Sequence, residues 1–434
     1  MSDSETIPAH KTQEAPGGEA APRAVFRPGG SLHAFSFPNF RRFFFGQLVS
    51  VAGTWMQTVA QQWLVYDLTR SSVWLGIVAG ASAIPYVLFA FKGGEVADRF
   101  PRRTILLWTQ SLSMIFAFAL AILATNRPVP IQGWHIAVFA GLSGIVNAFN
   151  MPAQQAFVTE MVDDPRAISN AIALNSLRFN LARFLGPMLA GIALVRLSAA
   201  ACFFLNGLSF IAVLISLSRM RLPTATRERG GATMFSPWEG VRFLGSLPSL
   251  WRVTVLIGVT SLFVLSVSTL FPVLAERYGQ GAVGFGTMVT VNGIGATVGG
   301  TLVVAVGNRI PRRLLVYGGA LQFCAFLAVL AWSRSYPLAL ICLFFAGIGM
   351  VVFTTSANTK VQEDAPNYLR GRVMAVYSLV ANALMPAGGL LLGFLSERYG
   401  PFLTIRIVSG LAFSVTLFLL LVSQREVRES NPQN

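Results

Sequence analysis

Two arginines, Arg178 and Arg183, lie inside an apolar run that covers residues 167 to 195. At a helical rise of about 1.5 Å per residue, both lie near the middle of a segment of that length. A charged side chain at such a position is costly and must face protein or water. Arg183 precedes Gly186-Pro187, so one interpretation is structural, with its guanidinium holding carbonyls that the proline frees. Arg178 is the better candidate for facing a cavity and an anionic group.

Amide side chains in two other apolar runs form a second candidate lining. Gln57 and Gln61 are four residues apart and therefore share one face of a helix. Trp55 lies beside them, and a later run supplies Asn147 and Asn150. Amides orient a small molecule by hydrogen bonds, and aromatic rings supply contact area. The alternative interpretation is hydrogen bonding between helices without any role in binding.

A basic turn occurs twice, because GGEVADRFPRR at 93–103 returns as GNRIPRR at 307–313, about 210 residues later. Asn308 stands in the second copy where Asp98 stands in the first. A duplicated unit would account for both copies. The interpretation that the residues alone offer is an anchor of basic residues on the cytoplasmic side of a membrane.

The composition indicates a membrane protein, because 54% of the residues are hydrophobic and only 12% are charged, whereas soluble proteins have roughly a quarter charged residues. The three cysteines lie in apolar runs at irregular spacing, which indicates reduced packing residues rather than disulfides or a zinc site. Residues 1–30 are polar and lack the apolar region of a secretory signal, so we expect a disordered tail.

Twelve apolar runs are long enough to cross a bilayer as helices, which takes roughly 20 residues each. Their predicted spans are 42–66, 73–97, 104–124, 134–158, 167–195, 199–219, 252–275, 283–306, 313–332, 337–359, 372–396 and 402–423. The sequence therefore predicts an all-α membrane protein of twelve transmembrane helices in two pseudo-symmetric bundles of six.

Basic residues indicate the orientation of these spans. Of 33 Lys and Arg residues, 23 fall on the face that holds both termini, six on the opposite face and four within spans. Basic loops face the cytoplasm, so we expect both termini there. This asymmetry also accounts for the net charge of +15, whereas nucleic-acid binding would require a soluble basic domain that the chain does not contain.

The longest connection between spans divides the chain into two halves, and the repeated turn falls at the corresponding place in each half. The predicted organisation is a disordered cytoplasmic tail at 1–36, a six-helix bundle at 37–219, a cytoplasmic linker at 220–251, a second bundle at 252–425 and a tail at 426–434. The later part of the linker fits an amphipathic helix on the membrane surface or a solvated segment. Two such halves around a site at their interface are typical of transporters.

The first copy of the turn resembles the signature G-x-L-A-D-R-x-G-R-[RK] of the major facilitator superfamily. The matching residues include Gly94, Asp98, Arg99, Arg102 and Arg103, and the departure is a proline, residue 101, where the family usually has glycine. The resemblance implies the major facilitator fold and a transport function.

A second signature, G-P-x-x-[GA]-G, is matched by Gly186, Pro187, Ala190 and Gly191. In the family it accompanies drug-type antiporters that export, although the first glycine of the longer pattern is alanine here. Four longer runs, at 40–76, 150–162, 175–191 and 284–300, are similar to the subgroup of enterobactin exporters and macrolide efflux proteins, in which an arginine at the position of Arg183 is common.

The resemblance also implies roles for the charged turn. Asp98 would cap or pair with the start of the eleventh span, near Arg370 and Arg372, where a carboxylate gains from both the helix dipole and the arginines. Arg99, Arg102 and Arg103 would contact acids at the ends of neighbouring helices, and Glu160 is the expected partner of one of them. These contacts would hold the cytoplasmic side closed.

The candidate substrate is an anionic or neutral amphiphile, because no Asp or Glu lies deep in a span to neutralise a cation. We expect a monomeric secondary exporter of a siderophore, a macrolide-like drug or a related metabolite, working by alternating access in the bacterial inner membrane, with proton antiport implied by the resemblance. An importer or lipid transporter of the same fold and a non-transporting membrane scaffold are the alternatives. No cofactor, metal site, nucleotide loop or enzymatic cluster is expected.

Overall fold

The computed structural model describes the chain at residues 32–125, 130–162, 164–220, 237–307, 309–366 and 369–430. The predicted disordered tail, apart from its last residues, lies outside the described part, as do Asn308 and residues 431–434. At some positions within helices, Arg370 and Arg372 among them, only the backbone is described.

The first half contains a short 3-10 helix, η2 (His33–Ser36), and six long helices. These are α1 (Pro38–Thr69), α2 (Ser72–Arg99), α3 (Arg102–Ala124), α4 (Gly133–Glu160), α5 (Pro165–Arg196) and α6 (Ala199–Ser218). Local sequence defines several starts: Ser71 Oγ accepts a hydrogen bond from the amide of Val73, and Asp164 accepts one from Arg166. Side-chain caps of this kind satisfy amides that have no partner within the helix.

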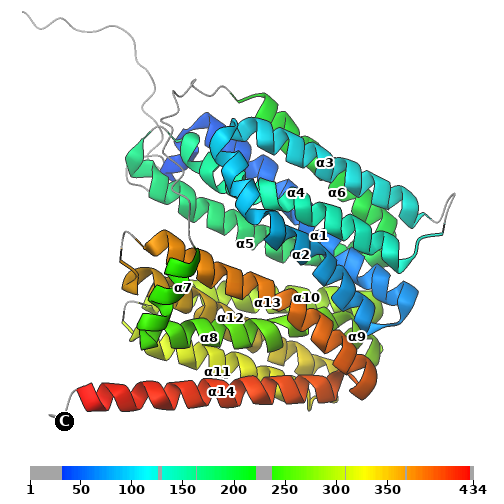
Figure 1. The fold of residues 1–434 in the computed structure, drawn as a ribbon. Coiled ribbons are helices and arrows are strands. Elements are labelled where there is room, and N and C mark those ends of the chain that lie inside the picture. The colour runs from blue at the N-terminus through cyan, green and yellow to red at the C-terminus, as the bar shows by residue number, and fades with distance from the viewer. Residues whose placement is uncertain are drawn as a thin grey trace, which may run out of the picture.

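The second half follows a short connecting helix, α7 (Pro237–Ser246). It comprises α8 (Pro248–Phe263), the 3-10 helix η3 (Leu265–Leu270), α9 (Phe271–Arg277), α10 (Gly281–Val306), α11 (Arg312–Leu330), α12 (Tyr336–Asp364), α13 (Arg370–Tyr399) and α14 (Pro401–Ser430). Figure 1 shows the two halves stacked as two layers of nearly parallel helices. With α8, η3 and α9 counted as one crossing, the described chain has the predicted twelve transmembrane helices.

The seventh span was expected as one continuous helix at 252–275. In the structure this helix is broken, which corrects the prediction. Between Phe263 and Phe271 the chain tightens into η3, and Ser266 Oγ donates to the carbonyls of Ser261 at 2.8 Å and Met385 at 2.7 Å. These bonds satisfy backbone oxygens near the break. Pro272, at the first turn of α9, has no amide to contribute to a continuous helix.

Two boundaries also differ from the sequence prediction. Helix α14 continues to Ser430, so its backbone extends into the predicted tail at 426–434. The later part of the predicted linker forms a helix, α7, and this helix packs against α13 and α8. Its Leu244 is fully buried in the core of the second half.

Eleven of the crossings are long and apolar enough to span a membrane among the described residues, and α1 is the exception. Helix α1 has 32 residues but carries a series of amides and hydroxyls. Some of these polar groups contact other helices, as Gln57 does with Asn206 of α6 and Gln61 with the carbonyl of Ile136 of α4, so α1 belongs to the bundle despite its lower hydropathy.

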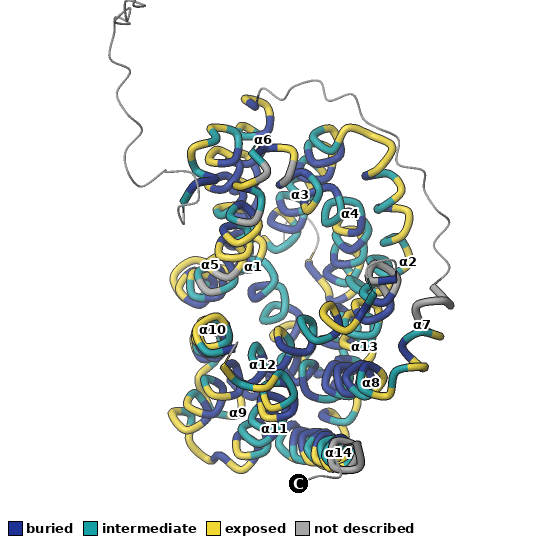
Figure 2. Tube along the Cα trace, turned by 90° about the vertical axis from the view of Figure 1, so that its left-hand side faces the viewer, coloured by how far each residue is buried: buried dark blue, intermediate teal, exposed yellow. Residues whose placement is uncertain are grey.

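The halves repeat one packing plan and meet through two helix pairs. Helix α2 packs on α4 as α10 packs on α12, and α3 packs on α6 as α11 packs on α14. Between the halves, α2 pairs with α13 and α5 with α10, as Figure 2 shows along the bundle. We call the end where the described chain begins and stops the termini end, and the opposite end the far end.

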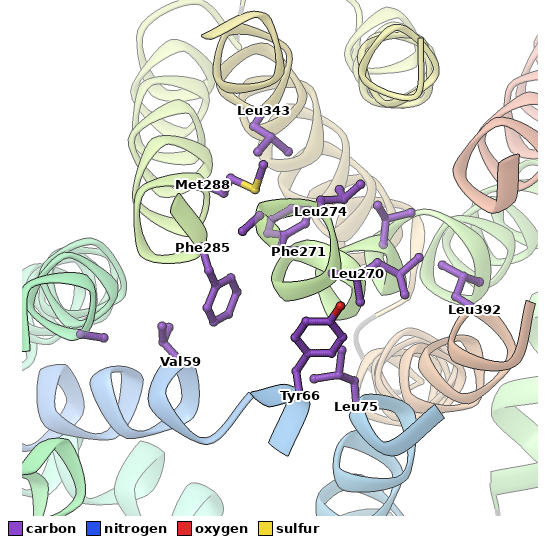
Figure 3. Packing of buried hydrophobic residues seen from close by; sticks show 14 of the residues in the cluster. Val59, Tyr66, Leu75, Leu270, Phe271, Leu274, Phe285, Met288, Leu343 and Leu392 are labelled. Atoms are coloured by element: carbon purple, nitrogen blue, oxygen red, sulfur yellow. The ribbon is translucent and has the colours of Figure 1, made fainter. Parts of the chain in front are cut away.

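The hydrophobic core is shared at the far end and divided at the termini end. One cluster combines first-half residues such as Val59, Tyr66 and Leu75 with Leu270 and Phe285 of the second half, as shown in Figure 3. Towards the termini end, a second cluster contains first-half residues and a third contains second-half residues. The two halves are therefore packed together at the far end and packed individually at the termini end.

Candidate functional site

Polar contacts between the halves reinforce the seal at the far end. Nη1 of Arg70, after α1, lies 3.0 Å from Oε1 of Glu276 in α9. Oε2 of Glu397 in α13 accepts hydrogen bonds from Ser71 Oγ at 2.8 Å and from the amide of Ser72 at 2.9 Å. A carboxylate from one half thus caps the N-terminus of α2 in the other half, where the helix dipole favours negative charge.

Glycines allow the helices of the two halves to cross closely. A Cβ at Gly286 of α10 would lie 2.6 Å from the Cα of Gly191 in α5. A Cβ at Gly76 of α2 would lie 2.7 Å from the carbonyl oxygen of Gly389 in α13. Gly191, which the export signature singles out, therefore lies at a contact between the halves, and a side chain at Gly286 would force the two helices apart.

The crossing face of α2 continues beyond its contact with α13. Gly94 lies 18 residues, or five helical turns, after Gly76 and so points in the same direction. A Cβ at Gly94 would meet nothing within 4 Å, and Asp98, one turn further, is exposed. Helices α2 and α13 therefore touch near the far end and leave this face uncovered near the termini end.

The proposed partners of Asp98 stay a prediction, because the side chains of Arg370 and Arg372 lie outside the described residues. Arg99 was expected to contact an acid of a neighbouring helix, and this is wrong in the structure. Its Nη2 lies 2.7 Å from Oε1 of Glu95, one turn earlier on α2. A residue four positions away on the same helix face is the nearer partner.

The expected contact of Glu160 is present. Nη1 of Arg102 lies 2.6 Å from Oε1 of Glu160 and donates to the carbonyl of Ala156 at 3.2 Å. Among the described residues Arg103 contacts no acid, contrary to expectation, and it donates to the carbonyl of Ser218 at the end of α6 at 2.8 Å. The negative end of a helix dipole takes the place of the predicted carboxylate.

The second copy of the turn repeats both contacts. Nη2 of Arg312 lies 3.3 Å from Oε1 of Glu363 in α12, and Arg313 donates to the carbonyl of Ser423 in α14 at 3.2 Å. The two arginines of each turn therefore join three helices of their own half. This shared role explains why the chain contains the same turn twice.

Arg178 does not face an open cavity in this conformation, which corrects the sequence prediction. Its side chain is 3% exposed, and its guanidinium carbon lies 5.6 Å from the ring centroid of Phe43 in α1. Its Nε and Nη1 have no hydrogen-bond partner among the described residues. The sequence indicated the depth of Arg178 along α5 but not the direction in which it points.

Arg183 lies against α1 rather than on described backbone carbonyls. Its guanidinium carbon is 5.8 Å from the ring of Trp55, whose ring also meets Phe179 edge-on at 6.1 Å. Gly186 allows this approach, because a Cβ there would lie 2.6 Å from the carbonyl oxygen of Ala52. Pro187 is buried beside it. The export signature thus forms the contact between α5 and α1.

The candidate amides divide among different neighbours instead of lining one surface. Gln57 accepts a hydrogen bond of 2.7 Å from Asn206 in α6, and Gln61 donates to the carbonyl of Ile136 in α4 at 3.3 Å. Asn147 is exposed. Asn150 was expected at the cavity, but its Oδ1 accepts hydrogen bonds from Thr109 at 3.0 Å and Gln110 at 3.2 Å, both in α3. For Gln57, Gln61 and Asn150 the structure shows contacts between helices.

Sequence reasoning missed several residues that the structure brings into prominence. Gln47 and Gln154 are 1% and 8% exposed, and their Nε2 atoms have no hydrogen-bond partner among the described residues. Gly93, rather than its neighbour in the signature, packs directly on the backbone of Ala148. The available signals were a glutamine inside an apolar run, as for Gln57, and a doubled glycine.

Two halves built on one plan, with glycine crossings between them and a seal at one end, define a multi-pass membrane transporter of the major facilitator fold. The chain belongs to the transmembrane secretion effector family of that superfamily, whose model matches residues 29–434. All of the described chain therefore lies within the family match.

Known relatives that align with this chain over most of their length are named as transporters. The chain is 25% identical over 401 residues to the staphyloferrin A transporter of Staphylococcus aureus, covering 90% of this chain and 98% of that protein. It is 26% identical over 380 residues to the multidrug efflux pump Tap of Mycobacterium tuberculosis, covering 82% and 86%. It is 24% identical over 388 residues to a putative bacilysin exporter of Bacillus subtilis, covering 86% and 93%.

Solved structures show the same fold at low identity. A bacterial homologue of the human lysosomal transporter Spinster, in an inward-facing and occupied conformation, matches with a TM-score of 0.70 and 13% identity, covering 89% of this chain and 96% of that chain. The nucleoside transporter NupG matches with a TM-score of 0.69 and 11% identity, covering 90% and 99%.

Proposed function

We propose that this protein exports a small amphiphilic molecule, such as a siderophore, a macrolide-like drug or a related metabolite, by alternating access. The observation that carries the proposal is the division of the hydrophobic core, shared at the far end and separate for each half at the termini end. An alternating-access transporter needs two halves that can rock about a site between them. Relatives named for siderophore, multidrug and bacilysin transport support export.

The proposal places the protein in the bacterial inner membrane as a monomer, with both termini in the cytoplasm. In that orientation the described conformation faces inward, with the outer end sealed by Arg70, Glu276 and Glu397. Closure of the inner end would bring α13 onto the uncovered face of α2, where Gly94 and Asp98 lie. Proton antiport supplies the energy in this proposal.

The test is substrate-induced proton movement in everted membrane vesicles, followed with a pH-sensitive dye. The panel contains siderophores, macrolides and lipophilic cations, and wild type is compared with Asp98→Asn at equal amounts of folded protein. We expect proton release from the vesicles in response to at least one class and its loss in the variant. If no compound of the panel induces proton movement while folded protein is present, drug-type antiport is contradicted.

A further inference from the structure

The buried polar residues of the two halves differ in kind. In the second half of the described chain, the buried polar side chains apart from tyrosine are serine and threonine hydroxyls. Several of these donate to a carbonyl of their own helix, as Thr254, Thr260 and Thr416 do at 2.6 to 2.9 Å. The first half instead buries five side chains with amide or guanidinium donors, namely the amides of Gln47, Gln110, Gln154 and Asn206 and the guanidinium of Arg178.

Three of these first-half side chains hold N–H donors without a hydrogen-bond partner among the described residues. They are Nε2 of Gln47, Nε2 of Gln154, and Nε and Nη1 of Arg178. Each side chain is more than nine-tenths buried, at 1%, 8% and 3% exposed. Burying a polar group without a partner is costly, and burying an unpaired charge is costlier still. Such a cost indicates a partner that the chain itself does not supply.

Two phenylalanine rings connect the three side chains. The guanidinium of Arg178 lies over Phe43 at 5.6 Å, and the ring of Phe43 meets that of Phe157 at 5.5 Å. Gln47 lies one helical turn from Phe43 on the same face of α1, and Gln154 lies one turn from Phe157 on the same face of α4. Helices α1, α4 and α5 therefore bring the unpartnered donors to one level of the first half.

We infer that Arg178, Gln47 and Gln154 form a subsite for the anionic group of an amphiphilic substrate. The unpartnered atoms are donors, two of them on a charged guanidinium, so they suit an ionised carboxylate or phosphate, which only accepts hydrogen bonds. The rings of Phe43 and Phe157 supply apolar contact for the rest of the molecule. The site is closed in this conformation, so Phe43 must move aside when the substrate enters.

This inference rests on the proposed export function and gives it a substrate class. It is tested on the purified full-length protein in detergent with two fluorescent probes, 11-(dansylamino)undecanoate and its methyl ester. The probes share a ring and a chain and differ in charge. We expect wild type to bind the carboxylate at least about tenfold more tightly, the value of a hydrogen bond to a charged group.

Arg178→Gln should reduce this preference to less than about twofold, while binding of the ester stays as in wild type. Lys92→Gln is the matched control, because it removes an exposed positive charge from α2 and should keep the preference. Gln154→Glu places a carboxylate at the subsite and should abolish the preference while preserving the melting temperature. It therefore keeps the test valid if Arg178→Gln fails to fold.

Two outcomes would overturn the inference. One is a wild-type protein that shows no preference for the carboxylate, including the case in which neither probe binds. The other is a preference that survives in folded Arg178→Gln or Gln154→Glu, which would leave Arg178 a structural residue. Transport measured in vesicles separates the two proposals. Export of neutral compounds without a carboxylate preference would support the exporter and contradict the subsite. Preferential binding of the carboxylate without transport would support the subsite and contradict the exporter.

Discussion

The carboxylate of Glu397, in the second half, accepts a hydrogen bond of 2.9 Å from the backbone amide of Ser72, in the first half. The same oxygen accepts from Ser71 Oγ at 2.8 Å, so one side chain caps the start of α2. The first amides of a helix have no partner within the helix, and a carboxylate satisfies them well. This cap must break when the halves separate at the far end.

Replacing Glu397 by alanine should therefore favour a conformation that is open at the far end. Loss of a helix cap costs about 1 kcal/mol, which would raise the open population about fivefold. Spin labels at Leu68 and Tyr399, which are exposed near the far end of the two halves, would report the change as a longer distance. Arg196→Gln removes a far-end charge in α5 and should leave the distribution unchanged. Equal distance distributions in wild type and Glu397→Ala would contradict a role of Glu397 in holding the far end closed.

Gly94 should be needed for closure and dispensable for stability. A Cβ at Gly94 meets nothing within 4 Å in this conformation, and alanine is the better helix former by about 0.5–1 kcal/mol. Gly94→Ala should therefore fold as well as wild type but transport less, because the added methyl lies on the face of α2 that α13 must approach. Vesicle transport per folded protein and the melting temperature measure the two effects.

Gly318→Ala is the matched control for that variant. Gly318 lies within α11, and a Cβ there also meets nothing within 4 Å. The control should keep both stability and transport. Full transport by Gly94→Ala would show that α13 does not close onto this face of α2.

The sequence predicted the spans and the pairing of Glu160 with an arginine of the turn, and the reasons are physical. A bilayer requires each crossing to be long and helical, so apolar runs mark the spans reliably. The pair of Arg102 and Glu160 was accessible because both residues end or begin helices on the same side of the membrane. The break at η3 could not be predicted from the sequence, because a 3-10 helix and an α-helix can share one apolar composition.

The directions of buried polar side chains could not be read from spacing alone. Gln57 and Gln61 are four residues apart, yet a helix turns about 100° per residue, so their directions differ by about 40°. That difference is enough for Gln57 to contact α6 and for Gln61 to contact α4. Arg178 is a parallel case, since its depth along α5 follows from the sequence and its contact with Phe43 depends on how α1 and α5 pack.

The two copies of the charged turn should differ in strength. Arg102 and Glu160 lie 2.6 Å apart with side chains 21% and 35% exposed, whereas Arg312 and Glu363 lie 3.3 Å apart and are 27% and 51% exposed. Double-mutant cycles with Arg→Gln and Glu→Gln should give a coupling energy of about 1 kcal/mol for the first pair and less for the second. The coupling energies are measured by unfolding the purified protein in denaturant. A larger coupling energy for Arg312 and Glu363 than for Arg102 and Glu160 would contradict this prediction.

Gln57 should act through stability rather than through substrate recognition. Its side chain accepts a hydrogen bond of 2.7 Å from Asn206, which is 2% exposed, so Gln57→Leu would leave a buried amide without this partner. Leaving such a group unsatisfied costs about 1–3 kcal/mol, whereas replacing both partners by apolar groups is nearly neutral. Gln57→Leu should therefore lower the melting temperature, and Gln57→Leu with Asn206→Leu should recover most of the loss. Transport per folded protein should stay close to wild type in both variants for every substrate. A selective loss of one substrate class in the double variant would instead show that Gln57 contacts the transported molecule.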